Sequence, residues 1–135
     1  MDRRDLFELR RINERIKNKM EQLDELKVLA QGVSSPKANP DVIQTSGTQD
    51  RMENIVVRII DLENEVDELV DRYADKRAKV ISAIYRLPRE RHQNILYERY
   101  ILSMKISEIA IQEKMLERSV KKAHAKALEA FEKLK

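Results

Sequence analysis

The sequence contains no cysteine and no tryptophan, and aromatic residues make up only 4% of its 135 residues. Without cysteine the chain forms no disulfide and offers no thiolate for catalysis or metal binding, which agrees with a reducing, cytoplasmic location. The shortage of aromatic rings excludes a core built on large aromatic side chains. Leu, Ile, Val and Ala must then supply the buried surface, as they do in long packed helices.

Glycine and proline are also rare, with two and three copies respectively. These are too few for the many turns of an all-β protein, and two isolated glycines cannot form a phosphate-binding loop. No apolar run approaches the roughly 18 to 20 residues that a membrane span requires, and the N-terminus has no apolar signal core. We therefore expect no association with a membrane.

The only two histidines are His92 and His124. No His-x-x-x-His spacing links them and no cysteine accompanies them, so a zinc site is not expected. Nothing in the residue order suggests a Ser-His-Asp triad, and the carboxylates recur as i,i+4 partners of Lys and Arg. We expect no enzyme activity, catalytic residue, cofactor, metal ion or small-molecule substrate, and we assign His124 a packing or hydrogen-bonding role.

Charged residues, by contrast, reach 38% and hydrophobic residues 41% of the chain. The apolar residues recur at steps of three and four, which predicts long helices with coiled-coil-like stripes. The first helix covers 5–30, and Gly32 is expected to end it in the left-handed conformation. The second covers 50–87. The stripe of the first helix comprises Leu6, Leu9, Ile12, Ile16, Met20, Leu23, Leu26 and Ala30.

The segment between these helices, residues 31–49, holds both glycines and two of the three prolines. It has no apolar periodicity, which indicates a flexible, exposed linker. The two helices should therefore pair as an antiparallel helical hairpin over residues 1–87. One hairpin leaves part of each stripe uncovered, so we expect a homodimer; alternatively, the rest of the chain folds back onto the hairpin.

Residues 88–135 are the basic part of the chain, with 11 Lys and Arg against 7 Asp and Glu. Pro88 breaks the second helix, and the apolar residues that follow outline three short helices. The last of these, at about 117–133, is suited to the major groove of DNA, and the small Ala110 allows a close helix crossing. We predict an all-α protein: a helical hairpin followed by a C-terminal helix-turn-helix module.

Several short motifs resemble region 4 of bacterial sigma factors. They are Leu87-Pro88-Arg89-Glu90-Arg91, Ile95-Leu96-Tyr97-Glu98-Arg99-Tyr100, Glu108-Ile109-Ala110, Ser119-Val120-Lys121 and Ala127-Leu128. The chain as a whole resembles small sigma-region-4-like proteins from phages and prophages of Gram-positive bacteria, through Ser34-Ser35-Pro36, Arg99-Tyr100-Ile101 and His124 as well. The resemblance implies a regulator of late-transcription-activator type in the cytoplasm of a bacterial or phage-infected cell.

The chain departs from the region 4 pattern around its turns. Lys105 and Leu116 stand where a Ser or Thr commonly caps a helix, Lys114 where Gly commonly makes the turn, and Glu113 where an apolar residue is typical. Loss of a helix cap costs about 1 kcal/mol. These changes affect the turn that would orient the last helix.

We predict sequence-specific binding to double-stranded DNA, because N-terminal residues of a recognition helix reach base edges and basic side chains attract phosphate. Arg99 could also clamp a phosphate, or pair with Glu98 or Glu108. The alternative is a non-catalytic adaptor whose hairpin binds a protein such as RNA polymerase, with the helix-turn-helix as a scaffold only. The predicted DNA-binding residues are Arg118, Ser119, Lys121, Lys122, Lys126, Arg89 and Arg91.

Overall fold

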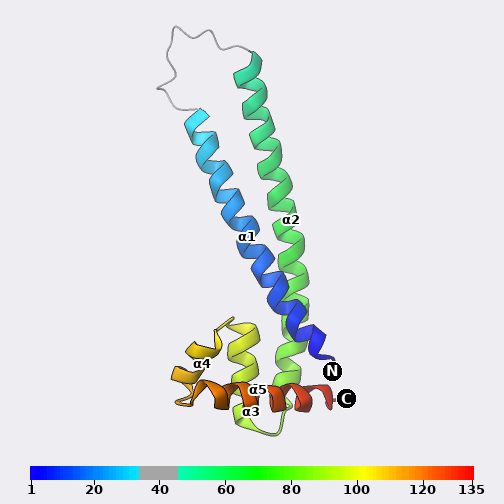
Figure 1. Cartoon of the computed structure of the whole chain (residues 1–135). Helices are drawn as coiled ribbons and strands as arrows, with labels where there is room; N and C mark the ends of the chain where they lie inside the picture. The colour runs from blue at the N-terminus through cyan, green and yellow to red at the C-terminus, as the bar shows by residue number, and fades with distance from the viewer. Residues whose placement is uncertain (34–45) are drawn as a thin grey trace. The chain divides into compact units, whose positions relative to one another are not determined.

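The structure is a computed structural model that describes residues 1–33 and 46–135. Every regular element in these two ranges is helical, so the all-α prediction is confirmed (Figure 1). The elements are α1 (Arg3–Val33), α2 (Ser46–Tyr85), α3 (Glu90–Leu96), the π-helical segment η1 (Tyr97–Ile101), α4 (Ile106–Gln112) and α5 (Glu117–Glu132). No helix in the described ranges is long and apolar enough to cross a membrane.

The prediction that Gly32 ends the first helix is wrong. Helix α1 continues to Val33, and Gly32 does not adopt a positive φ. A glycine within a helix costs only about 1 kcal/mol relative to alanine, so its neighbours can carry it through. The predicted linker is correspondingly shortened, because 31–33 and 46–49 are helical, while 34–45 lies outside the described residues.

The chain divides into two compact units, and both long helices contribute to each. We call residues 1–13 and 72–135 the terminal unit, and residues 14–71 the middle unit. Dimerisation through residues 1–87 and DNA binding through residues 88–135 stay predictions about function.

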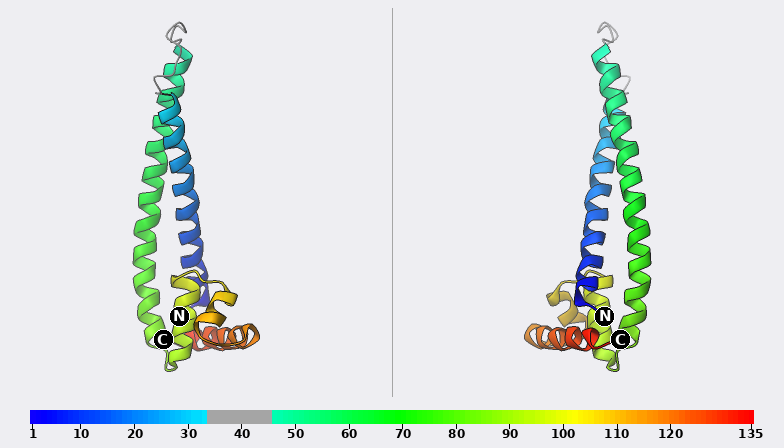
Figure 2. Two further views of the ribbon diagram at one scale, coloured as in Figure 1. Left: turned by 90° about the vertical axis from the view of Figure 1, so that its left-hand side faces the viewer. Right: turned by 90° about the vertical axis from the view of Figure 1, so that its right-hand side faces the viewer.

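In the middle unit, α1 and α2 lie side by side (Figure 2). Ion pairs join them between Lys19 and Glu65, at 2.8 Å, and between Lys27 and Glu63, at 3.9 Å. Met20, although part of the predicted stripe, is 50% exposed. The buried apolar side chains of this unit are Ile16, Leu23, Ile55, Leu62 and Leu69.

The terminal unit has a core to which both ends of the chain contribute. Leu6 and Leu9 of α1 pack in one cluster with Val80 and Ile84 of α2 and with Phe131 of α5. Arg3 forms an ion pair with Glu132, and the N-terminal ammonium group donates to the carbonyl of Leu134. The C-terminal helices therefore cover part of the apolar stripes of α1 and α2. This is the arrangement that was expected as the alternative to a homodimer.

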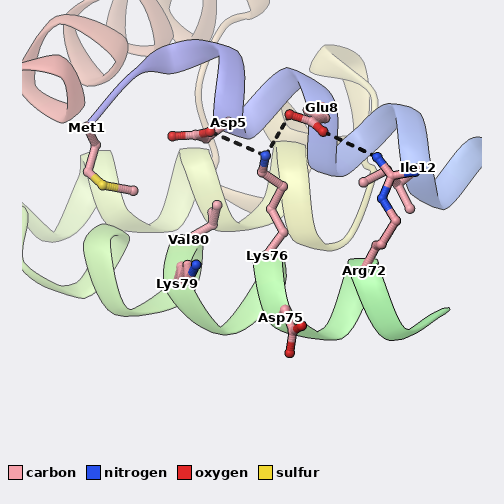
Figure 3. A pocket seen from close by; sticks show the side chains of 9 residues that line it. All are labelled: Met1, Asp5, Glu8, Ile12, Arg72, Asp75, Lys76, Lys79 and Val80. Atoms are coloured by element: carbon pink, nitrogen blue, oxygen red, sulfur yellow. Dashed lines mark hydrogen bonds and ion pairs between the residues drawn. The ribbon is translucent and has the colours of Figure 1, made fainter. Parts of the chain in front are cut away.

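Ion pairs also join the two long helices within the terminal unit (Figure 3). The Lys76 ammonium group lies 2.6 Å from Glu8 and 3.4 Å from Asp5, and Arg72 lies 3.7 Å from Glu8. These contacts lower the pKa of Glu8 and raise that of Lys76. They line an open hollow of about 450 Å³ in which these opposite charges neutralise one another.

Candidate nucleic-acid interface

The turn between α4 and α5 closes on a pattern of hydrogen bonds typical of helix C-termini. Lys114 adopts the left-handed conformation, with φ 56°, at the position where glycine is common. The Met115 N–H donates to the carbonyl of Ala110 at 2.9 Å, and the Lys114 N–H donates to that of Ile111 at 3.3 Å. This is a Schellman motif, which is accessible to lysine at a cost of about 1 kcal/mol.

The helix starts at Lys105 and Leu116, which lack the usual Ser or Thr cap, are hydrogen-bonded in different ways. At the start of α4, the Glu108 carboxylate accepts from the Lys105 N–H at 3.2 Å, which supplies half of a capping box. At the start of α5, Leu116 provides no side-chain cap. Its carbonyl accepts from the N–H groups of Ser119 and Val120, so the first turn forms without one.

A second apolar cluster holds α5 against the turn. Val120, on the inner face of α5, packs with Ile95 of α3 and with Ile109 and Ala110 of α4. Val120, Ile95 and Ile109 are all fully buried. Met115 also packs against this cluster, which adds the hydrophobic contact that often accompanies a Schellman motif. The cluster fixes which face of α5 points outward.

The predicted DNA-binding residues all lie in the terminal unit and outside its core. The basic ones are exposed and Ser119 is half-buried. None of the basic residues forms an ion pair within the described part of the chain, in contrast to Lys19, Lys76 and Arg3. The exposed basic residues are Arg118, Lys121, Lys122 and Lys126 of α5, Arg91 of α3, and Arg89 at the residue preceding α3.

Charge is distributed unevenly along α5. Residues 117–126 contain four basic residues and one acidic residue, whereas 127–132 contain two acidic residues and no basic one. One of the latter is Glu132, which is already paired with Arg3. The unpaired positive charge therefore gathers at the N-terminal part of α5, next to the turn.

Two of the predicted residues, Arg89 and Lys126, influence the ionisation of His92. Burial lowers the pKa of His92, and the nearby positive charges of Arg89 and Lys126 lower it further. His92 is only 9% exposed, and its Nδ1 atom is buried without a hydrogen-bond partner among residues 1–33 and 46–135. The positive charges of Arg89, next to α3, and of Lys126, on α5, therefore both act on this histidine.

Arg99 and His124 have structural partners instead. The Arg99 guanidinium donates to the carbonyl of Met104 at 2.9 Å, and the side chain is half-buried. His124 Nε2 lies 2.7 Å from the Tyr100 hydroxyl, and the two rings stack. The expected hydrogen-bonding role of His124 is confirmed, and Arg99 is engaged with the turn that follows η1.

Sequence reasoning missed a pair of carboxyl groups close to the turn. Burial raises the pKa of Glu98 to about 7, and the neighbouring Glu113 contributes through charge repulsion and a shared hydrogen bond. Glu98 Oε2 is buried and has no hydrogen-bond partner in the part of the chain that the structure describes. The only signal was that Glu113 stands at a position where apolar residues are typical.

Comparison of the chain with protein-family models, with characterised proteins and with solved structures gave no match.

Proposed function

We propose that this protein is a sequence-specific DNA-binding transcription regulator of phage type, similar to sigma factor region 4. In this proposal α4 and α5 act as a helix-turn-helix, and α5 is the recognition helix that enters the major groove. Helices α1 and α2 act as an antiparallel hairpin through which two copies dimerise. The protein then activates transcription from the site it binds, alone or through RNA polymerase.

The observation that carries the proposal is the set of exposed, unpaired basic side chains at the N-terminal part of α5 and around α3. A basic group that already forms an ion pair within the protein gains little free energy by binding a phosphate. An unpaired basic group attracts the phosphate and releases its counterions. Three of them, Arg118, Lys121 and Lys122, lie within the first two turns of α5. Residues there reach base edges in helix-turn-helix complexes.

The test is a fluorescence-polarisation titration of a labelled duplex with the double variant K121E/K122E. Both lysines are exposed, so the variant should keep its fold, as circular dichroism would verify. We expect loss of duplex binding, because two favourable phosphate interactions become repulsive. The matched control is K133E/K135E, which changes the net charge equally at the other end of α5 and should retain most of the binding. Unchanged binding by K121E/K122E would contradict the proposal.

A protein-binding adaptor is the second candidate, and exposed apolar side chains of the middle unit favour it. Val57 is 55% exposed and Ile60 50% exposed on α2, while Val28 is 67% exposed and Leu29 50% exposed on α1. Exposed apolar side chains that cluster commonly mark an interface. The proposed homodimer would use the same surface, so the two assignments compete for it.

Salt dependence and mass separate these assignments. An adaptor that binds through apolar side chains should bind its partner with little dependence on salt, whereas duplex binding should weaken steeply. Light scattering of the purified chain tests the homodimer: we expect twice the mass of one chain, and a V57D/I60D variant should return it to the mass of one. A single-chain mass for the unchanged protein would contradict dimerisation.

A further inference from the structure

One exposed apolar side chain, that of Leu116, lies close in sequence to the exposed basic residues at the N-terminal part of α5. Leu116 is 61% exposed, although it immediately precedes α5 and its side chain caps nothing. Its backbone is extended, with φ −75° and ψ 147°. A Ser, Thr, Asp or Asn at this position would stabilise the helix by about 1 kcal/mol, so leucine gives up a cap and exposes apolar surface to water.

The surroundings of Leu116 indicate what kind of ligand covers it. Lys114 stands two residues before it, Arg118 two residues after it, and Lys121 lies one turn further along α5; all three are exposed. Glu117, directly after Leu116, is the one exposed acidic residue among them. A basic surface of this kind repels basic proteins and attracts polyanions. An apolar group carried by a polyanion would cover Leu116 while the basic side chains bind the negative charges around it.

Double-stranded DNA offers one such group in the major groove, the C5-methyl of thymine, which proteins read by apolar contact. We propose that Leu116 contacts a thymine methyl and makes the protein prefer a T·A pair at the position facing the start of α5. This inference rests on the proposed DNA-binding function and deepens it by naming the base that is read.

The test begins with the tightest-binding duplex selected from a random library by the unchanged protein. Each thymine of that duplex is then replaced in turn by deoxyuridine, which removes only the methyl group. We expect one replacement to weaken binding about three- to fivefold, the effect of losing one buried methyl contact. In L116A the same replacement should have no effect, and L116A should bind the thymine duplex as weakly as the unchanged protein binds the deoxyuridine duplex.

The matched control is L102A. Leu102 is 54% exposed, belongs to the same unit, and lies in the turn before α4 rather than after it. It should keep the full preference for thymine over deoxyuridine. A selected site without thymine, or a preference that persists in L116A, overturns the inference while leaving DNA binding intact. Failure to select any duplex overturns the proposed function as well.

Discussion

Replacement of Glu98 by glutamine tests the carboxyl pair near the turn. The substitution keeps the shape of the side chain, removes its charge, and places an amide donor beside the Glu113 carboxyl group. Burial, with Glu113 second, raises the pKa of Glu98 from its ordinary 4.5 to about 7 in the folded protein. The folded state therefore holds this proton more tightly than the unfolded state does.

The sign and size of the effect follow from this difference. A carboxyl group whose pKa is raised by folding contributes its full stability below pH 4.5, and loses it as the pH rises from 4.5 to about 7. The difference between the two pKa values corresponds to about 3 kcal/mol of folding free energy. Because the half-buried carboxyl group is still in contact with water, we expect only about 1 to 2 kcal/mol of it to be measured. E98Q should therefore be more stable than the unchanged protein by that amount at pH 8.5, and about equal to it at pH 4.5.

Urea denaturation of both proteins at the two pH values measures the difference. The titrations of His92 and His124 are common to both chains and cancel in the comparison. If the stability difference between E98Q and the unchanged protein is the same at pH 4.5 and pH 8.5, folding does not raise the pKa of Glu98 as described.

Two further substitutions test the packing and the turn. Lys114→Gly should stabilise the fold by about 1 kcal/mol in urea denaturation, because it relieves the left-handed strain at φ 56°; no gain would contradict the strain argument. Phe131→Ala should cost about 3 to 5 kcal/mol, because Phe131 is fully buried in the cluster that unites α1, α2 and α5. A loss below about 1 kcal/mol there would show that α5 does not depend on this core.

The periodicity of apolar residues predicted the long helices well, because burial along one face of a helix imposes steps of three and four on the sequence. The last helix was expected at about 117–133 and is found at Glu117–Glu132. Gly32 was misread, because a glycine marks a helix end only when the chain turns there. Met20 follows the stripe but stays half-exposed, since periodicity gives the face of a helix and not what covers it.

The candidate site could be predicted only in part. Basic residues on one helix, such as Lys121 and Lys122, follow from the sequence because their spacing places them outside the core. The effect of both Arg89 and Lys126 on the pKa of His92 depends on how α3 packs on α5, which no local pattern contains. The same holds for Glu98 of η1 and Glu113 at the end of α4, which interact across the turn between these two helices.

The salt dependence of duplex binding tests the central claim most directly. The predicted DNA-binding residues of the terminal unit include six exposed basic ones, Arg89, Arg91, Arg118, Lys121, Lys122 and Lys126. If about four to six of them neutralise phosphates, a plot of the logarithm of the binding constant against the logarithm of salt concentration should fall with a slope of about −4 to −5. A slope near zero, or no measurable binding at low salt, would contradict the assignment of α5 as a DNA-binding helix.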